Sequence, residues 1–258
     1  MKKNIKILTL NIGNPSLTRA ELLIEWLKKR EEDIFILTET KNSEGCKRIA
    51  DFFSKGENSL FETFAARNVF FPIPKDNNYG VMCISKYRIT PNLLTVFEDS
   101  ILNTRAIDLE IYAENKKIHL IGLYVPSRDQ SEVKIKKKKY FLEKISEELG
   151  KRNNQCCIIC GDFNIVDRKH FPKYNVFFDW EYGFYDTLID FKYIDAFKFC
   201  NPNEYDYSWV GRTNNGYRYD YFFVSEDEIN NIDLCFFIHE TRLLKISDHS
   251  AIVLKMKL

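Results

Sequence analysis

The chain has 258 residues, with 38 Lys and Arg against 37 Asp and Glu, so its formal net charge is only +1. Hydrophobic residues make up 45% and charged residues 29%, which excludes a disordered chain and is enough for a sizeable core. The near balance of charge also excludes a protein that coats nucleic acid through bulk positive charge. Any polyanion would have to bind a local basic patch.

The sequence favours a cytoplasmic protein without a membrane anchor. No run of about 18 apolar residues could form a membrane-spanning helix, and Met1–Ile5 leads into a predicted strand without the apolar core of a signal peptide. The seven cysteines are an odd number and suit a reducing compartment. Cys157 and Cys160 form a C-x-x-C motif, but a strand over Cys156–Cys160 would place them on opposite faces. We therefore interpret them as structural residues rather than as a zinc or redox pair.

The first part of the chain alternates strand and helix patterns. Short apolar runs predict strands at Ile5–Leu10 and Asp33–Thr38. Between them, Thr18–Glu21 has the spacing of a helix capping box. The apolar residues that follow at helical intervals are Leu22, Leu23, Trp26 and Leu27. These patterns predict a strand–helix–strand unit.

A second unit of the same kind follows. It has a predicted strand at Lys117–Tyr124, a helix near Lys137–Leu149 that is ended by Gly150, and the strand at Cys156–Cys160. Further strands are predicted at Tyr79–Ser85, Arg105–Tyr112, Tyr219–Ser225 and Ser250–Met256. Because no linker, repeat or change in composition divides the chain, we expect one domain over residues 1–258. The excess of strands over helices favours an α/β fold with two sheets and helices outside them.

Polar residues stand where four of these apolar strands end. They are Asn11 and Glu39 in the first unit, and Tyr124 and Asp162 in the second. Open α/β sheets present their ligand groups at the carboxyl ends of strands. We therefore expect one site, assembled between two related halves of the chain.

The sharpest local signal is Gly161-Asp162-Phe163-Asn164, which follows a strongly apolar strand. Asp162 and Asn164 are two residues apart, so their side chains can face the same way while Phe163 anchors the turn in the core. Gly, Asp and Asn are also ordinary turn formers, so a plain polar turn is the alternative.

The second signal is Ser247-Asp248-His249, directly before the predicted C-terminal strand. Histidine is the side chain best able to exchange a proton near neutral pH. Asp220 lies inside an aromatic strand, where a carboxylate needs a partner, and His249 is the candidate. A surface loop with incidental polar residues is the alternative reading of this segment.

Several carboxylates accompany these signals. The chain lacks a Cys/His set with zinc spacing, whereas oxygen donors are abundant at the predicted site. Oxygen ligands favour Mg²⁺ or Mn²⁺. The carboxylates concerned are those of Glu39, Asp162, Asp220 and Asp248.

Short motifs follow one another along nearly the whole chain. They are Leu10-Asn11, Leu37-Thr38-Glu39-Thr40-Lys41, Tyr79-Gly80-Val81, Leu123-Tyr124-Val125-Pro126, Gly161-Asp162-Phe163-Asn164, Tyr207-Ser208-Trp209, Arg218-Tyr219-Asp220-Tyr221 and Ser247-Asp248-His249. In this order they resemble the endonuclease/exonuclease/phosphatase superfamily over residues 7–254. The resemblance implies a four-layer α/β sandwich, with two mixed sheets packed face to face and helices outside. The tyrosine at position 124 resembles the exonuclease III and apurinic/apyrimidinic endonuclease branch, because lipid-cleaving and deoxyribonuclease I-like members typically carry histidine there.

The resemblance also implies roles for the residues around the metal. Glu39 would bind the divalent ion, with Asn11 nearby and Asp248 as a second contact. Asp162, oriented by Asn11 and Asn164, would position and activate the attacking water. The expected cofactor is Mg²⁺ or Mn²⁺.

A further set of residues would act on the phosphate. By the same resemblance, His249 is held by Asp220 and hydrogen-bonds to the scissile phosphate, and Tyr124 adds a second donor. The leaving group would be the 3′ oxygen, which gives 5′-phosphate ends.

Substrate contacts are expected from cations near aromatic residues. Arg212 and Arg218 stand close in sequence to Trp209 and Tyr217, and we predict that the two arginines and Trp209 contact DNA. Arg128 stands loosely where the exonuclease III branch has a substrate-contacting arginine. The densest basic run consists of Lys134, Lys136, Lys137, Lys138 and Lys139. We interpret it as a solvated helix face, and substrate binding is the alternative.

The implied activity is that of a metal-dependent phosphodiesterase that hydrolyses DNA as a 3′-to-5′ exonuclease, an abasic-site endonuclease or a nicking enzyme. We expect a monomer whose partner is duplex DNA, and RNA stays open as a substrate. The alternatives are hydrolysis of RNA or a small phosphoester, and a nucleic-acid-binding relative that has lost catalysis.

Overall fold

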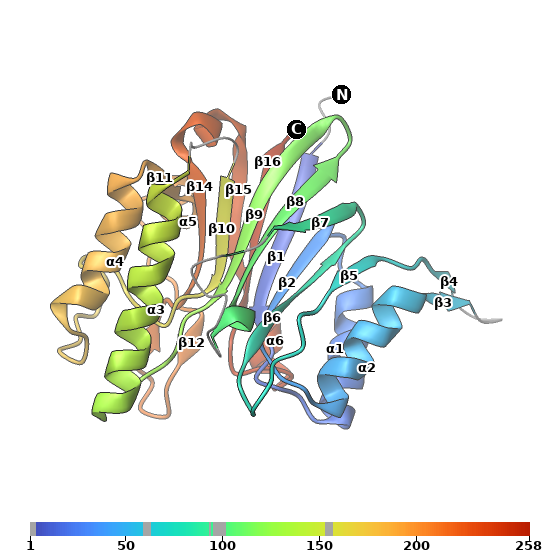
Figure 1. Cartoon of the computed structure of the whole chain (residues 1–258), viewed down its shortest axis with the longest axis horizontal. Coiled ribbons are helices and arrows are strands. Elements are labelled where there is room, and N and C mark those ends of the chain that lie inside the picture. Colours follow the sequence, from blue (N-terminus) through green and yellow to red (C-terminus); the bar gives the residue numbers. More distant parts are fainter. Residues whose placement is uncertain (1–3, 59–62, 93, 95–101, 153–156) are drawn as a thin grey trace.

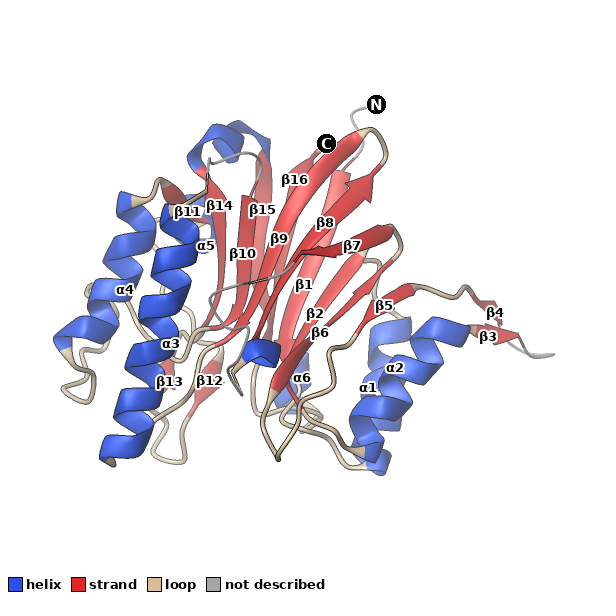
Figure 2. Ribbon diagram, viewed as in Figure 1, coloured by secondary structure: helices blue, strands red, loops and turns tan. Residues whose placement is uncertain are grey.

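Two six-stranded β-sheets lie face to face at the centre of the molecule, and helices cover both outer faces (Figure 1). The structure is a computed structural model, and it describes residues 4–58, 63–92, 94, 102–152 and 157–258. Figure 2 shows the order helix, sheet, sheet, helix across the molecule. This order confirms the expected four-layer α/β sandwich.

The first sheet has the strand order β15-β16-β1-β2-β6-β5. Its strands are β1 (Asn4–Asn11), β2 (Ile34–Thr40), β5 (Asn68–Phe70), β6 (Gly80–Ser85), β15 (Ile232–Ile238) and β16 (Ala251–Lys257). β1 and β2 are parallel, whereas the other neighbours are antiparallel. The helices on its outer face are α1 (Leu17–Lys28), which connects β1 to β2, and α2 (Glu44–Lys55).

The second sheet repeats this plan with the strand order β11-β14-β10-β9-β8-β7. Its strands are β7 (Arg88–Asn92), β8 (Ala106–Ala113), β9 (Lys116–Tyr124), β10 (Cys157–Asp162), β11 (Tyr193–Asp195) and β14 (Asp220–Ser225). β9 and β10 are its parallel pair. The covering helices are α3 (Glu132–Gly150), which connects β9 to β10, and α4 (Asp179–Asp190). Both predicted strand–helix–strand units are therefore present.

Short elements connect these layers. They are β3 (Glu57–Asn58), β4 (Thr63–Phe64), η2 (Asn103–Arg105), α5 (Ala196–Cys200), β12 (Trp209–Val210), β13 (Gly216–Tyr217), η3 (Glu226–Asn231) and α6 (Glu240–Leu243). None of the helices in the described ranges is long and apolar enough to cross a membrane.

Apolar side chains form three layers, one between the sheets and one under each helix pair. The layer between the sheets includes Ile7, Ile36, Ile158, Cys160 and Phe222. The outer layers include Leu23, Leu27 and Phe53 on one side, and Phe141, Ile145, Cys157 and Phe163 on the other. The two cysteines of the C-x-x-C motif are thus buried in different layers, as expected for opposite faces of β10; Cys156 lies outside the described residues.

Most strand ends differ from the sequence predictions by one or two residues, and three further differences involve helices. Ser16 caps α1 by accepting a 3.3 Å hydrogen bond from the Arg19 backbone N–H, so the capping box predicted at Thr18–Glu21 is wrong. α3 begins at Glu132, because the lysines before position 137 are good helix formers and extend it. Arg105 belongs to the short helix η2 rather than to the following strand.

Candidate active site

The polar residues at the four strand ends meet in one cavity. β1, β2, β9 and β10 all run toward the end of the sandwich that lies away from both chain termini (Figure 1). Asn11, Glu39, Tyr124 and Asp162 line a cavity of about 410 Å³ there, together with His249. The structure therefore brings together the residues that the strand ends predicted.

Asp162 is a buried carboxylate held by two amides. It is 1% exposed, and its Oδ2 accepts hydrogen bonds from Asn11 Nδ2 at 2.9 Å and Asn164 Nδ2 at 3.1 Å. Its Oδ1 accepts the backbone N–H of Asn164 at 2.9 Å. Burial, and then the negative charge of Asp220, raise the pKa of Asp162 to about 7, although these hydrogen bonds and His249 act in the opposite direction. The carboxyl group thus titrates near neutral pH.

The local backbone explains why this turn has its sequence. Gly161 has φ of +131°, and a Cβ there would lie 2.0 Å from the carbonyl oxygen of Leu123. Only glycine allows β10 to approach β9 so closely. Asn164 adopts φ of +49°, which turns its backbone N–H back toward Asp162. Phe163 is fully buried and packs against Tyr221. The motif is therefore more than a plain polar turn.

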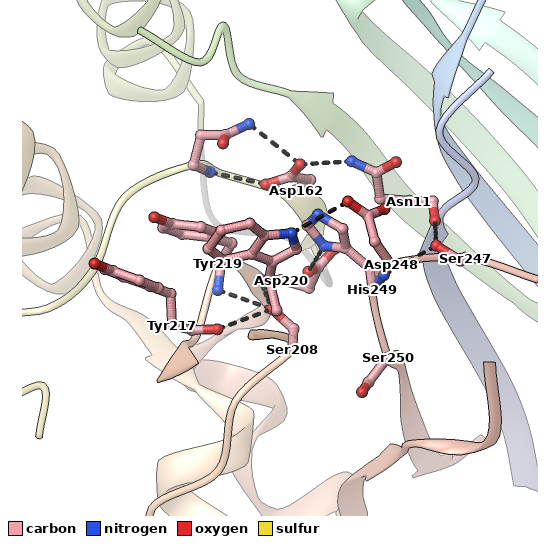
Figure 3. A network of polar contacts seen from close by, with 12 residues as sticks. Asn11, Asp162, Ser208, Tyr217, Tyr219, Asp220, Ser247, Asp248, His249 and Ser250 are labelled. Carbon is pink, nitrogen blue, oxygen red and sulfur yellow. Dashed lines mark hydrogen bonds and ion pairs between the residues drawn. The ribbon is translucent and has the colours of Figure 1, made fainter. Parts of the chain in front are cut away.

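His249 and Asp220 form a second buried pair beside Asp162 (Figure 3). The distance from His249 Nδ1 to Asp220 Oδ2 is 2.7 Å, and the two residues are 6% and 0% exposed. Burial alone would lower the pKa of His249, but the carboxylates of Asp220 and Asp162 outweigh it and raise this pKa to about 9. The imidazole is therefore positively charged at neutral pH.

Hydroxyl groups position this pair from both sides (Figure 3). Ser247 Oγ donates to the Asn11 carbonyl at 2.5 Å and accepts the His249 backbone N–H at 3.0 Å. Ser208 Oγ accepts the backbone N–H of Asp220 at 3.1 Å. The loop before β16 and the start of β14 are thus fixed to the site.

Glu39 is the cavity carboxylate that best suits a cation. It has φ of +59° at an irregularity in the β2–β6 pairing, and its Oε2 accepts Asn11 Nδ2 at 2.9 Å. Among the described residues, no Lys or Arg side chain is ion-paired with Glu39, and no group of three or more His, Cys, Asp or Glu residues could hold a metal. Mg²⁺ is commonly bound through one or two carboxylates and several waters, so a single cavity carboxylate fits such an ion.

The other two predicted metal contacts are placed differently. Asn11 directs its Nδ2 toward the carboxylates of Glu39 and Asp162, while its Oδ1 accepts the Gly13 backbone N–H at 2.8 Å. The Asn11 amide nitrogen thus orients the two carboxylates, and metal binding by Asn11 stays a prediction. Asp248 is exposed and accepts a 3.1 Å hydrogen bond from Trp209 Nε1.

One wall of the cavity is cationic, and the sequence did not reveal it. Arg105, Lys134 and Lys137 line this wall. The basic run of α3 is therefore divided: Lys134 and Lys137 face the site, which corrects the reading of the whole run as a solvated helix face. Lys138 is buried, donates to the carbonyl of Asn164 at 2.7 Å and forms an ion pair with Glu181. Lys136 and Lys139 are exposed and do not line the cavity, whereas Lys134 is exposed at its edge.

The predicted substrate contacts fall into two groups. Trp209 and Arg128 line a second cavity of about 380 Å³ that shares His249 with the first, and Trp209 forms a backbone bridge to His249. Arg212 is exposed in the turn between β12 and β13. The guanidinium of Arg128 is paired with Glu181.

Arg218 is buried and paired in this structure, which argues against the predicted contact with DNA. It is 4% exposed, and its guanidinium bonds to Asp195 at 2.7 and 2.9 Å and to Asp167 at 3.2 Å. Its side chain holds the core together behind the site.

Comparisons with known proteins agree with this architecture. An AP endonuclease from Archaeoglobus fulgidus superposes with a TM-score of 0.78 at 22% identity, over 98% of this chain and 100% of that chain. A 3′ phosphatase from Neisseria bound to a product DNA hairpin gives 0.77 at 18% identity, and a 3′-5′ exonuclease from Neisseria meningitidis gives 0.77 at 20% identity, both with the same coverage. At these identities the likeness shows a shared fold.

The fold and the family comparison together define a class of phosphoester hydrolases and nucleases. The sequence model described as the Endonuclease/Exonuclease/phosphatase family matches residues 8–249, so the chain belongs to that family. No curated protein matches the chain significantly.

Proposed function

We propose that the chain is a metal-dependent phosphodiesterase that hydrolyses DNA, with Mg²⁺ or Mn²⁺ as cofactor and the chemistry of the exonuclease III and apurinic/apyrimidinic endonuclease branch. The observation that carries this proposal is a buried carboxylate and a buried imidazole in the wall of one cavity. Asp162 is held by two amides, and His249 is held by Asp220. Such a pair can accept a proton from water on one side and donate to a phosphate on the other.

Asp162 is the proposed base. A carboxylate whose pKa lies near 7 is available at neutral pH and is also basic enough to take a proton from a water molecule. Asn11 and Asn164 fix both of its oxygens, so the carboxylate keeps one orientation toward the cavity. This fixed orientation positions the attacking water.

His249 and Tyr124 are the proposed donors to the scissile phosphate. Asp220 accepts from His249 Nδ1, which leaves Nε2–H of the charged imidazole for the substrate. Burial, and then the charges of Glu39 and Asp162, raise the pKa of Tyr124 well above its usual value, so its hydroxyl stays protonated and able to donate. Both donors stabilise charge that develops on the phosphate oxygens.

Glu39 is the proposed metal ligand, and Asp248 remains a proposed second contact. The ion would supply Lewis-acid stabilisation of the phosphate charge when bound. Asn11 would keep the Glu39 carboxylate in place for it through the 2.9 Å hydrogen bond.

DNA is the proposed substrate because the cavities combine charge with stacking surface. Cations line the first cavity, and Trp209 and Tyr219 line the second, next to His249. One solved structure of this fold holds a product DNA hairpin, which supports the same class of substrate. That the protein acts as a monomer in the cytoplasm stays a prediction.

The test is a cleavage panel. Duplexes labelled at either end, in intact, nicked and abasic form, are incubated with Mg²⁺, with Mn²⁺ or with EDTA, beside matched RNA and bis(p-nitrophenyl) phosphate. We expect metal-dependent cleavage of DNA that leaves 5′-phosphate ends. A ladder of products would indicate an exonuclease, and a single product would indicate an endonuclease. Asp162→Asn, purified in parallel, should lose activity by roughly a thousandfold, which excludes a contaminating nuclease.

Three results of the panel would change the proposal. Faster cleavage of RNA would make RNA the substrate, and faster turnover of the small diester than of any nucleic acid would indicate a small phosphoester. Binding of DNA without cleavage under any metal condition would support a relative that has lost catalysis.

A further inference from the structure

Arg105 is a buried cation in the wall of the catalytic cavity. It is 5% exposed, and its guanidinium stacks on the rings of Tyr124 and Tyr79, with centroid distances of 4.6 and 5.2 Å. Its Nη1 donates to the Tyr124 carbonyl at 3.3 Å. Its Nε is buried and has no hydrogen-bond acceptor within the described part of the chain. The guanidinium therefore keeps unused hydrogen-bonding capacity beside the site.

Lys137 approaches the same wall from α3. Its Nζ lies 3.4 Å from Asn78 Oδ1, a neutral acceptor. Burial, and then the positive charge of Arg105, lower the pKa of Lys137. Two cations thus stand close enough to repel each other, and the acceptors that bond to them in the described ranges are an amide oxygen and a backbone carbonyl.

Neighbouring buried cations are treated differently by this fold. Lys138, the next residue in α3, has the carboxylate of Glu181 at 2.5 Å, and Arg128 pairs with the same carboxylate. Burying a charge without a partner is costly, and cations in protein interiors normally have one. Within the described ranges, no carboxylate is ion-paired with Arg105 or Lys137, so their wall is suited to an anion that comes from outside the chain.

The acidic residue nearest to this wall does not fill that role. Glu39 lines the same cavity, but its carboxylate accepts a hydrogen bond from Asn11 and is ion-paired with neither Arg105 nor Lys137 in the described part of the chain. The scissile phosphate is assigned to His249 and Tyr124, and Arg105 lies against the face of the Tyr124 ring. An anion that reaches Arg105 and Lys137 is therefore a different group of the substrate.

We propose that Arg105 and Lys137 form an anion subsite that binds a second phosphate of the nucleic-acid strand, adjacent to the one that is cleaved. The proposal rests on the proposed function, because the second anion is a neighbouring phosphate of the same substrate. The subsite makes the enzyme prefer a polynucleotide over a diester with a single phosphate. Lys134, which already pairs with Asp129 at 2.9 Å, lies at its outer edge.

The experiment pairs a change in the protein with a change in the DNA. Duplex binding is measured by fluorescence anisotropy in the Asp162→Asn background, so that no cleavage is needed. The duplexes carry a single neutral methylphosphonate at each phosphate near the cleavage position in turn. In the parent protein, we expect one position at which the methylphosphonate weakens binding by about tenfold. In Lys137→Gln, the methylphosphonate at that same position should change the affinity very little.

The control variant is Lys136→Gln. Lys136 lies on the same helix, but its side chain is 77% exposed and pairs with Glu132 at 3.0 Å. It should respond to every methylphosphonate as the parent protein does. The slope of log affinity against log salt concentration measures the number of phosphate contacts. Lys137→Gln should make this slope shallower by about 1, the amount for one contact, whereas Lys136→Gln should leave it unchanged.

A second readout uses active protein. In Lys137→Gln and in Arg105→Lys, kcat/KM should fall about tenfold more for DNA than for bis(p-nitrophenyl) phosphate, which has one phosphate. Equal losses on both substrates, or methylphosphonate effects that are the same in Lys137→Gln and the parent, would overturn the subsite. If the parent protein cleaves nothing but the binding pattern is found, the subsite stands and the proposed catalytic function fails.

Discussion

Asn11 and Asp162 are 151 residues apart in the chain, and the amide of Asn11 donates a 2.9 Å hydrogen bond to the carboxylate of Asp162. Asn11 ends β1 of one sheet, and Asp162 ends β10 of the other. The same amide nitrogen also bonds to Glu39 at 2.9 Å. The site therefore exists only when the two sheets are packed against each other, and its geometry depends on the core between them.

The pair of His249 and Asp220 should make the stability of the protein depend on pH. The folded-state pKa of His249 is about 9, above the value of about 6.5 in an unfolded chain. The stabilisation is thus complete below pH 6.5 and is lost as pH rises through 9. It corresponds to roughly 3 kcal/mol. Urea denaturation of metal-free protein at closely spaced pH values measures it.

The matched variant for this prediction is His249→Gln, which should show a smaller loss of stability between pH 6.5 and 9. The difference between the two proteins measures His249 together with its effect on the pKa of Asp162, because buried cysteines such as Cys83, whose pKa burial raises, contribute equally to both. His119→Gln, in β9, should follow the wild type. The same pH dependence in His249→Gln and wild type would contradict the assignment.

The sequence alone predicted where the strands end, and it predicted that the motifs around Asp162 and His249 belong to the site. Apolar runs that stop at a polar residue mark the carboxyl end of a strand, and parallel strands bring such ends together. The partner of His249 could also be predicted, because a carboxylate inside the aromatic strand β14 needs one. These inferences depend on local pattern and on the cost of burying charge.

Pairings of charged residues could not be predicted in the same way. Arg218 stands among aromatic residues in the sequence, which favoured DNA contact, but Asp195 and Asp167 bind its guanidinium in the core. Arg105 and Lys137 face the site only because η2 and α3 pack at its edge. Which lysine of a basic run is buried depends on helix rotation and on a distant partner such as Glu181, and neither is encoded in local composition.

Replacing Glu39 by Gln should weaken metal binding while preserving the fold, because the two side chains have the same shape and the amide still fills the site. The midpoint concentration for stabilisation by Mn²⁺, measured as the rise in Tm, should increase by at least about tenfold. Glu44→Gln is the matched control, since Glu44 is 78% exposed in α2. Equal midpoints in Glu39→Gln and wild type would remove Glu39 as the ligand.

Glu181 should be essential for stability, because it neutralises two buried cations. Its side chain is 1% exposed and pairs with both Lys138 and Arg128. Glu181→Gln would leave these charges buried without a carboxylate and should lower the free energy of unfolding by about 3–5 kcal/mol. Glu143→Gln, whose exposed side chain pairs with Lys139 in the same helix, should change it by less than about 1 kcal/mol. Similar losses for the two variants in urea denaturation would argue against a structural role for the buried pairs.

Gly161 and Gly183 form a matched pair for testing the backbone of the site. At Gly161, an alanine Cβ would lie 2.0 Å from the Leu123 carbonyl oxygen, and φ is +131°. Gly161→Ala must therefore separate β10 from β9, displace Asp162 and destabilise the protein. At Gly183, in α4, nothing lies within 4 Å of the added Cβ. Gly183→Ala should instead stabilise the protein by roughly 0.5–1 kcal/mol, because alanine loses less conformational freedom than glycine in a helix.

The measurements for this pair are Tm and cleavage activity on the preferred substrate. Gly161→Ala should lower both, and activity should be lost even at temperatures where the variant is still folded, because the carboxylate no longer meets Asn11. Gly183→Ala should raise Tm and leave activity unchanged. If Gly161→Ala kept full activity, the close approach of β10 to β9 would not be needed to place Asp162.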